Sequence, residues 1–579
     1  MPHRLQIQAA QATSSMNGEF RYEEWNVQKL TETMRESNIA DCAIKAFTEN
    51  KIDGKKLKAL TENEFTKMGL RLGDWFDIRE FREHLQHQDV NNNKVFLGNP
   101  KIFNDPIHGN IVLNPVCLAI IDTPQFQRLR YLKQLGLVYF VYPGAAHNRF
   151  EHSMGVCHLA GQYARSLRDG QKYLGITDQD ILCVEIAGLC HDLGHGPYSH
   201  TFDQMFIPAV IPKSKWTHEQ ASKDMFDYLV DKNKLRDVFQ SHGLTETDMV
   251  FIKELIAPNM AKNGEWVHHG RPQEKSFLYE IVANKRNNID VDKWDYMARD
   301  CHQLGIRNNF DHLRFIQFAR VNAVEEQHQI CLRDKEVLNL YNMFSTRYTL
   351  HKIAYQHQVA SSMALMVAHA LVKANNHVFI KGSHSKQLKI SECINDMEAY
   401  SHLTDNILFK ILDTESEAED MKAAKELIRR LFSRDLYKCV YHSKPIDPRR
   451  MTDRDEAMIA QEIVTLSENK LSTNDFVVEV VRLDFGMNEE NPVERLHVYS
   501  KHNPDIARRF PKEEASRILA ANYTELLLRV YSCEQRKVRS RSRKVESKST
   551  AITAACEKWF TVHFQNSNGS ATIARSNDI

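Results

Sequence analysis

A histidine–aspartate pair at the end of an apolar helix is the feature that most constrains how this chain can fold. In the stretch GLCHDLGHGPYSH, His191 and Asp192 follow the apolar residues of a predicted helix, and glycines and a proline then break the helical pattern. Both side chains therefore lie at a helix end that faces a turn. Burying such a pair is costly unless its members are paired or bound to a metal ion. The fold must bring partners to this pair.

Two polar residues from distant helical stretches are the candidate partners. His152 opens the helical pattern HSMGVCHLAG, and Asp292 lies between Val291 and Trp294 on an otherwise apolar face. Two imidazoles and two carboxylates suit a first-row divalent ion (iron, manganese, zinc, cobalt or nickel) and leave two positions open for water and substrate. Any one of these histidines alone is most simply a core or surface residue. The set of four predicts a metal site.

The composition restricts the other possibilities. The chain has 579 residues, of which 42% are hydrophobic and 26% charged, as in an ordinary folded protein. Lys and Arg total 76 against 75 Asp and Glu, so a nucleic-acid or phosphate site must be a local patch. The 11 cysteines form no C-x-x-C pair, which indicates free thiols in a reducing compartment. Long apolar runs and P-loop motifs are both missing, which predicts no membrane span and no P-loop nucleotide site.

The apolar pattern predicts a mainly α fold in several parts. The stretch LTENEFTKMGLRLGDWFDIREFREHL resembles the C-terminal half of a sterile alpha motif (SAM) domain, and an unrelated helical bundle is the alternative. The predicted parts are a disordered N-terminus (1–20), a SAM-like helical bundle (21–88), a linker (89–100), a large all-helical domain (101–440), a smaller α+β lobe (441–563) and a disordered tail (564–579). The basic run at 536–548 is either a solvated surface or a nuclear-import or phosphate-contacting segment.

Several motifs together resemble one known family. They are DPIHGNIVL, IDTPQFQRLRYLKQLG, HNRFEHSMGV, GLCHDLGHGPYSH, KWTHEQAS and IDVDKWDYMARDC. The pattern H…HD…D is the signature of the HD-domain phosphohydrolases. The flanking motifs are similar to the vertebrate members that join a SAM and an HD domain and hydrolyse deoxynucleoside triphosphates (dNTPs). The resemblance runs from about residue 20 to about residue 540, and it makes the domain at 101–440 an HD domain.

The resemblance implies a role for each matching position in an active site. The metal ligands would be His152, His191, Asp192 and Asp292, holding iron, zinc or manganese, with Mg²⁺ assisting on the nucleotide phosphates. The residues around the reacting phosphate would be His195, His200, His218, Asp203 and Glu219, with His200 favoured as the acid that protonates the leaving 5′-oxygen. The substrate-binding residues would be Gln134, Leu135, Arg149, Lys293, Tyr296, Asp300, Arg347 and Tyr355.

The resemblance also implies two activator sites between subunits of a homotetramer. The site for GTP or dGTP would use Lys101, Ile102, Asp122, Gln127 and Arg130. The site for a dNTP would use Asn104, Val141, Tyr142, Arg314, Arg333, Lys335, His357, Arg434, Lys438 and Lys501. The chain departs from the family at Gln358, where the pattern has lysine. The second site therefore lacks one phosphate-facing charge.

The functional prediction is a metal-dependent hydrolase that converts dNTPs to deoxynucleoside and inorganic triphosphate. By family implication it lowers dNTP pools, restricts viruses that need them, and resides in the nucleus, with the cytoplasm left open. A different HD-type nucleotide phosphohydrolase is one alternative. A protein that binds single-stranded nucleic acid is the other. The C-terminus lacks the Thr-Pro context for phosphorylation, so we do not extend cell-cycle control to this chain.

Overall fold

The structure is a computed structural model that divides into two compact units, residues Met1–Lys101 with Asn114–Val116, and residues Ile102–Leu113 with Cys117–Ile579. It describes residues 22, 25–37, 39–70, single positions from 74 to 85, 99–259, 265–325, 327–451, 454–468, 470–487, 489–510, 514, 522–535 and 548–565. The predictions of disorder at 1–20, and most of those for the linker, the basic run and the C-terminal tail, fall outside these residues. Among the described residues, no helix combines the length and apolarity needed to cross a bilayer.

Among the described residues of the first unit, four short helices have defined bounds: α1 (Val27–Glu36), α2 (Asp41–Glu49), α3 (Gly54–Ala59) and α4 (Glu62–Lys67); the described positions between 74 and 85 are helical as well. Asn26, Asp53 and Thr61 each cap a helix by accepting a hydrogen bond from a backbone N–H. The helices enclose one apolar core, in which Leu30 and Phe47 are fully buried. These residues therefore form a small helical bundle, and the likeness to a SAM domain stays a prediction.

The helical body of the second unit is built around α8 (Arg149–Gly170) and α9 (Asp178–Cys190), which pack against each other. A capping box between Asn148 and Glu151 starts α8. Nearly every residue of α9 is buried, because helices surround it. α13 (Glu246–Ile256) packs on α9, and α14 (Val291–Leu304) packs on α8. Between residues 149 and 300 the described regular elements are all helices.

Small sheets complete the second unit. A four-stranded sheet has the order β10 (Arg508–Arg509), β9 (His497–Tyr499), β4 (Gln327–Arg333), β3 (Ala319–Val324), in which only β4 and β9 are parallel. β1 (Lys101–Asp105) and β2 (Gly109–Leu113) form one hairpin, and β5 (Phe379–Lys381) and β6 (Gln387–Lys389) form another. The mainly α prediction is confirmed. The domain at 101–440, which was predicted to be all-helical, also contains strands. They are short and lie outside the segments with a helical apolar pattern.

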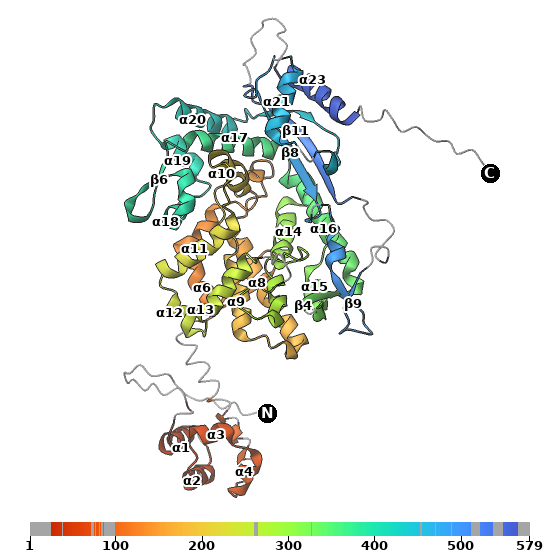
Figure 1. Cartoon of the computed structure of the whole chain (residues 1–579). Helices are drawn as coiled ribbons and strands as arrows, with labels where there is room; N and C mark the ends of the chain where they lie inside the picture. Colours follow the sequence, from red (N-terminus) through yellow and green to blue (C-terminus); the bar gives the residue numbers. More distant parts are fainter. Residues whose placement is uncertain are drawn as a thin grey trace, which may run out of the picture. The chain divides into compact units, whose positions relative to one another are not determined.

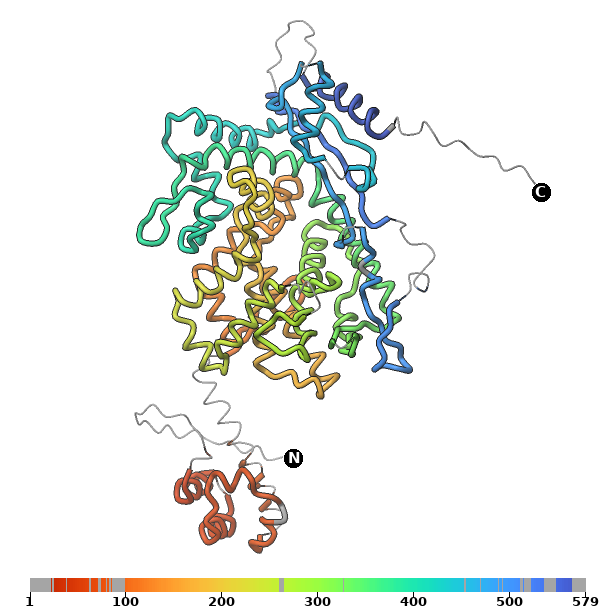
Figure 2. Tube along the Cα trace, in the orientation of Figure 1, coloured from red at the N-terminus to blue at the C-terminus, as the bar shows by residue number. Residues whose placement is uncertain are grey.

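The C-terminal residues form an antiparallel sheet in the order β7 (Lys438–His442), β11 (Thr524–Ser532), β8 (Phe476–Asp484). Helices α21 (Glu456–Leu466) and α23 (Lys548–Phe560) pack against it, with Ile459, Leu528 and Trp559 fully buried between them. Figure 2 shows this sheet and its helices at one end of the second unit. The sheet and the helical body belong to the same compact unit.

The remaining helical segments are α6 (Pro115–Ile121), α7 (Pro124–Gln127), η2 (Arg128–Tyr131), η3 (Gly136–Phe140), η4 (Lys172–Leu174), η5 (Thr201–Phe206), α10 (Ile207–Val210), α11 (His218–Lys232), α12 (Arg236–Ser241), η6 (Gln273–Glu280), α15 (His312–Phe318), η7 (Asp334–Glu336), α16 (Val337–Leu350), η8 (His351–Tyr355), α17 (Gln358–Ala374), η9 (Ser383–Ser385), η10 (Ile390–Asn395), α18 (Met397–Tyr400), α19 (Ile407–Asp413), α20 (Glu419–Phe432), η11 (Pro448–Arg450), η12 (Pro492–Arg495) and η13 (Thr561–Gln565). α20 packs against α17, and α19 packs against α20 (Figure 1).

Candidate metal centre and active site

The four residues predicted as metal ligands converge in the structure. His152 comes from α8, His191 and Asp192 from the end of α9, and Asp292 from the first turn of α14. Nε2 of His152 lies 3.1 Å from Oδ1 of Asp292 and 3.6 Å from Oδ2 of Asp192. Nε2 of His191 lies 3.4 Å from Oδ1 of Asp292 and 3.3 Å from Oδ1 of Asp192. The ligand atoms of His152, His191 and Asp192 lie within 4.8 Å of one another, and both imidazoles also contact Asp292.

The hydrogen bonds at Nδ1 of the two imidazoles direct Nε2 of each toward the carboxylates of the cluster. Nδ1 of His191 donates to the carbonyl of Gly188 at 2.8 Å, and among the described residues its buried Nε2 makes no hydrogen bond. Nδ1 of His152 donates to Asp295 at 2.7 Å. Histidine binds metals through a neutral ring nitrogen whose partner nitrogen is fixed by such a bond. The donor set therefore fits a divalent first-row ion.

Neighbouring side chains shift the pKa values of the residues in this cluster. Burial opposes protonation of His152, but hydrogen bonds to Asp292 and Asp295 raise its pKa to about 10. Burial raises the pKa of Asp292, yet bonds to His152 and His191 bring it well below the usual range. The pKa of Asp192 is likewise lowered against burial, chiefly by Arg149. Because histidine must lose its proton to ligate, a bound cation would replace the protons that hold these carboxylates.

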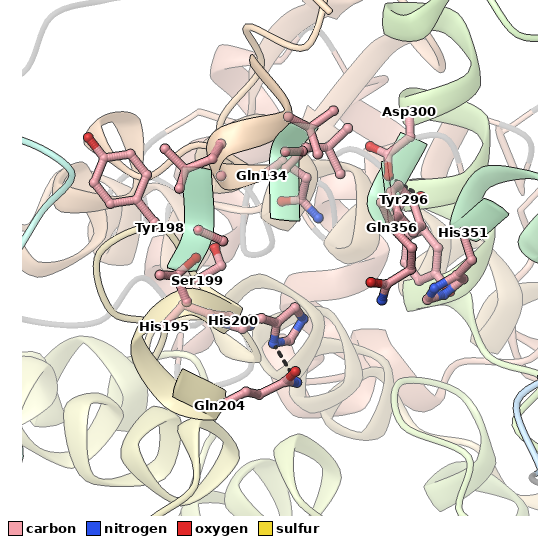
Figure 3. A pocket seen from close by; sticks show the side chains of 18 of the residues that line it. Gln134, His195, Tyr198, Ser199, His200, Gln204, Tyr296, Asp300, His351 and Gln356 are labelled. Carbon is pink, nitrogen blue, oxygen red and sulfur yellow. Dashed lines mark hydrogen bonds between the residues drawn. The ribbon is translucent and has the colours of Figure 1, made fainter. Parts of the chain in front are cut away.

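A cavity of about 530 Å³ opens on this cluster. Figure 3 shows other residues that line it, among them Gln134, His195 and Tyr296. His152, Asp192 and Asp292 lie on its wall, while His191 faces a second cavity of about 220 Å³ on the other side. Seven of the eight predicted substrate-binding residues line the larger cavity: Gln134, Leu135, Arg149, Tyr296, Asp300, Arg347 and Tyr355. The eighth, Lys293, lines the smaller cavity and pairs with Asp290 at 3.0 Å. The metal cluster therefore lies between two cavities.

Three histidines predicted to act on the phosphate line the larger cavity. The rings of His195 and His218 stack at 4.1 Å, and His200 stands 5.4 Å from His195, centroid to centroid. Asp203 lies behind them and accepts from Nδ1 of His218 at 2.8 Å. The ligand atoms of His195, Asp203 and His218 lie within 4.8 Å of one another, so they too could hold a cation. Glu219 lies beside His218, with Oε2 3.7 Å from its Nδ1, and lines the smaller cavity.

The environment gives these groups different charges. Burial and the nearby Arg149 hold the pKa of His195 well below its ordinary value, so this imidazole is neutral. Burial raises the pKa of Asp203, but hydrogen bonds from His200 and His218 lower it far more, so this carboxylate is ionised. His200 is the most exposed of the three, with 58% of its side chain accessible. It is the group best placed to exchange a proton with a bound molecule.

Comparisons with known proteins agree with this site. Residues 149–300 match the HD domain family, and this match contains all four ligand positions. The chain is 47% identical over 526 residues to the deoxynucleoside triphosphate triphosphohydrolase SAMHD1 of Danio rerio, covering 89% of this chain and 82% of that protein. It is 45% identical over 521 residues to the Homo sapiens protein of that name, covering 88% and 82%. For the SAMHD1 homolog of Dictyostelium discoideum the identity is 34% over 463 residues, covering 79% and 82%.

The chain belongs to the SAMHD1 family.

Membership in the SAMHD1 family confirms the predicted family, and together with the His/Asp cluster the HD-domain match identifies a divalent-metal site. Several further residues that no motif indicated line the larger cavity, among them Ser199, Gln204, His351 and Gln356. In Figure 3, Gln204 and His200 are joined by a hydrogen bond of 3.2 Å on one side of the cavity, and His351 and Gln356 lie on another. A signal for His351 exists: it lies one helical turn from Arg347 and one from Tyr355.

The carboxylate of Asp300 is held in place by two side-chain hydrogen bonds. It accepts from Nε2 of His147 at 2.6 Å and from the hydroxyl of Tyr355. Arg347 donates to the carbonyl and the carboxylate of Asp484, at 2.6 and 3.2 Å, which holds its guanidinium at the cavity wall. The walls of the cavity are therefore set by side-chain bonds between segments far apart in the sequence.

The residues expected at the activator sites lie in separate places. A hydrogen bond of 2.8 Å joins Gln127, at the end of α7, to Arg130 on η2, while Asp122 precedes α7 and Lys101 and Ile102 begin β1. Most of the residues expected for the second nucleotide form two groups. One group is Val141, Tyr142, His357 and Arg434, and the other is Arg314, Arg333 and Lys335. The remaining three, Asn104, Lys438 and Lys501, lie on β1, on β7 and in the segment after β9.

Proposed function

We propose that the protein hydrolyses dNTPs to deoxynucleoside and inorganic triphosphate at the metal centre. One observation carries this proposal: the four-ligand cluster opens on a cavity whose wall also presents Arg149, which pairs with Asp192, together with Arg347, Gln134 and Asp300. Guanidinium groups suit phosphoryl oxygens, and amide and carboxylate groups suit the hydroxyl of a sugar. The names of the relatives in zebrafish and human state the same activity for those proteins.

The residues of the chain divide the work of this reaction. His152, His191, Asp192 and Asp292 would hold a divalent ion, which would supply Lewis-acid stabilisation of phosphoryl charge and activation of water. Arg149 and Arg347 hold the triphosphate by charge-assisted hydrogen bonds. His200 donates a proton to the departing 5′-oxygen, and Asp203 steadies His200 and His218. Gln134, Leu135 and Asp300 read the sugar.

Regulation forms a second layer of the proposal. GTP or dGTP would bind through Lys101, Asp122, Gln127 and Arg130, and a dNTP through the second set with Mg²⁺ on the phosphates. These events would assemble a homotetramer. Depletion of dNTP pools, restriction of viruses and nuclear residence follow from the same family resemblance. The four-ligand cluster favours the hydrolase over a protein that only binds single-stranded nucleic acid.

Product identification tests the proposal. Purified protein is incubated with dGTP, GTP and Mn²⁺ or Fe²⁺, and the products are separated by anion exchange. The proposal expects deoxyguanosine and triphosphate in equal amounts, and no product from Asp292→Ala. Release of monophosphate or pyrophosphate would instead assign another HD-type phosphohydrolase. No turnover in the presence of metal and GTP would refute hydrolysis, and salt-sensitive binding of single strands that survives Asp292→Ala would then favour the binding protein.

A further inference from the structure

Asp405, which lies outside the matched HD domain, forms hydrogen bonds with two loops at the larger cavity. It lies between α18 and α19, whereas the HD match ends at residue 300. Its carboxylate accepts from the backbone N–H of Lys133 at 2.8 Å and from that of Tyr198 at 2.6 Å. Its own N–H donates to the carbonyl of Tyr131 at 3.1 Å, and the hydroxyl of Tyr198 donates to its carbonyl at 3.0 Å. Four hydrogen bonds thus fix this one residue between two loops.

The two loops carry different parts of the site. Lys133 directly precedes Gln134 and Leu135, which line the cavity on the side assigned to the sugar. Tyr198 lies between His195 and His200, which line the side assigned to the phosphate. The carboxylate of Asp405 therefore sets the spacing between the sugar side and the histidine side.

Arg128 and residues 400–405 also bind the backbone carbonyls of residues 193–195, in the turn that carries His195. The buried guanidinium of Arg128 donates to the carbonyls of Leu193 and His195, at 3.1 and 2.7 Å, and to that of Leu403 at 2.8 Å. The hydroxyl of Tyr400 donates to the carbonyl of Gly194 at 2.7 Å. Residues 400–405, together with Arg128, thus hold the turn after Asp192 at both its N–H and its C=O groups.

The turn is one that needs such support. Tyr198 and Ser199 have φ of 55° and 52°, in the left-handed region that side chains other than glycine rarely adopt. Strained residues of this kind persist where the surroundings determine their conformation. The turn also lies tightly against the opposite loop, since a Cβ on Gly136 would come within 3.0 Å of the Tyr198 carbonyl.

Stability does not explain an ionised carboxylate at this position. Burial raises the pKa of Asp405 to about 6, although Lys133 and Arg128 face it and the two backbone N–H groups favour its charge. A raised pKa means that folding disfavours the charged form relative to the protonated form, so ionisation of this side chain at neutral pH lowers the stability of the fold. Its contribution is to the geometry of the loops.

We propose that Asp405 is a positioning residue of the hydrolytic site, which fixes the Gln134 loop against the His195–His200 turn. The expected effect on catalysis rests on the proposed function. The expected effect on the two loops rests on the hydrogen bonds alone. In Asp405→Asn the side chain keeps its shape, but one of the two backbone N–H groups then faces an amide NH₂. The metal ligands lie on other elements, so the metal affinity stays at the wild-type value.

The test compares wild type, Asp405→Asn and the control Asp475→Asn by three measurements. Asp475 accepts from the backbone N–H of Ser472 at 2.8 Å in the C-terminal lobe, away from the site. The measurements are kcat and KM for dGTP and GTP, Mn²⁺ affinity, and hydrogen exchange of the peptides covering residues 131–136 and 194–203. We expect Asp405→Asn to lower kcat about 10- to 100-fold, to reduce the preference for dGTP over GTP, and to speed exchange in these two peptides only. The control should match wild type.

Each result decides the proposal. Wild-type kcat and selectivity in Asp405→Asn, or unchanged exchange in the two peptides, would overturn it, as would an equal loss of kcat in Asp475→Asn. If the wild type yields no deoxynucleoside, the proposed function fails, and the exchange measurement alone then decides the role of Asp405. Should Asp405→Asn not fold, Tyr198→Phe removes only the hydroxyl bond to Asp405. The same two peptides must then exchange faster than in wild type, and unchanged exchange overturns the proposal.

Discussion

Nδ1 of His152 lies 2.7 Å from Oδ2 of Asp295, a carboxylate with no exposure to solvent. The other oxygen of Asp295 lies 2.7 Å from Nε2 of His108, and Arg299 donates to both oxygens, at 2.8 and 2.9 Å. Asp295 therefore determines which ring nitrogen of His152 carries the proton and directs Nε2 to the metal cluster. Partners of this kind orient a metal ligand and raise its basicity.

Asp295→Asn is expected to weaken metal binding about 10- to 100-fold, because an amide is a poorer acceptor for the His152 N–H. Competition with a chelating dye measures the Mn²⁺ or Zn²⁺ affinity directly, without reliance on turnover. Glu280→Gln is the matched control, since Glu280 is equally buried but faces Arg286 and the backbone of Ile330. An affinity equal to that of wild type in Asp295→Asn would remove the orienting role.

Gly155→Ala tests the same contact from α8. A Cβ at Gly155 would lie 1.8 Å from Oδ1 of Asp295, so the carboxylate would have to move. We expect a loss of about 1–3 kcal/mol in the free energy of unfolding, together with weaker metal binding. Gly170→Ala, on the same helix, meets open space and should leave stability unchanged or raise it by up to about 1 kcal/mol. Denaturant unfolding measures both, and equal effects of the two variants would contradict the steric argument.

His200→Ala should lower kcat for dGTP by about 10²–10⁴-fold while the metal affinity is retained, because the loss concerns a proton donor and no ligand. A nitrophenyl phosphodiester separates the two roles, since its leaving group departs without protonation. On that substrate the variant should approach the wild-type rate. A matching loss on both substrates would show that His200 acts in binding or in structure. Gln204→Ala, which removes the bond to Nδ1 of His200, serves as a milder comparison.

Glu280 gives the stability of the protein a defined pH dependence. Burial raises the pKa of Glu280 to about 7 in the folded protein, against an ordinary value of 4.5. The folded state therefore binds a proton more tightly than the unfolded state does, and the stability contributed by this group is lost as pH rises from about 4.5 to 7.

Relative to wild type, Glu280→Gln should gain stability over that interval, by at most about 3 kcal/mol at pH 8. Urea titrations at pH 4.5, 6 and 8 measure the difference between the two proteins. A difference that is the same at all three values would contradict the assignment.

The sequence predicted the ligands of the metal centre because their chemistry is local. A His–Asp pair at the end of the apolar α9 cannot be buried alone, and His152 and Asp292 stand at helical positions that can reach it. The helical periodicity likewise predicted the helices that carry these residues. Gln134, Arg149, His195 and His200 stand in the family motifs and Arg347 follows from the wider resemblance, and the structure places all five on one cavity.

Other features depend on contacts that no local pattern encodes. Nothing near Asp295 or Asp405 in the sequence indicates which ligand or loop each supports, because their partners lie on other elements of the chain. The pairing of β4 with β9 and the placement of Lys293 and Glu219 on the smaller cavity likewise depend on contacts between distant segments. Side-chain chemistry and helical period act over a few residues and so determined the ligand set. The spacing of the cavity walls depends on chain segments that meet only when the whole unit packs, and only the tertiary structure decided it.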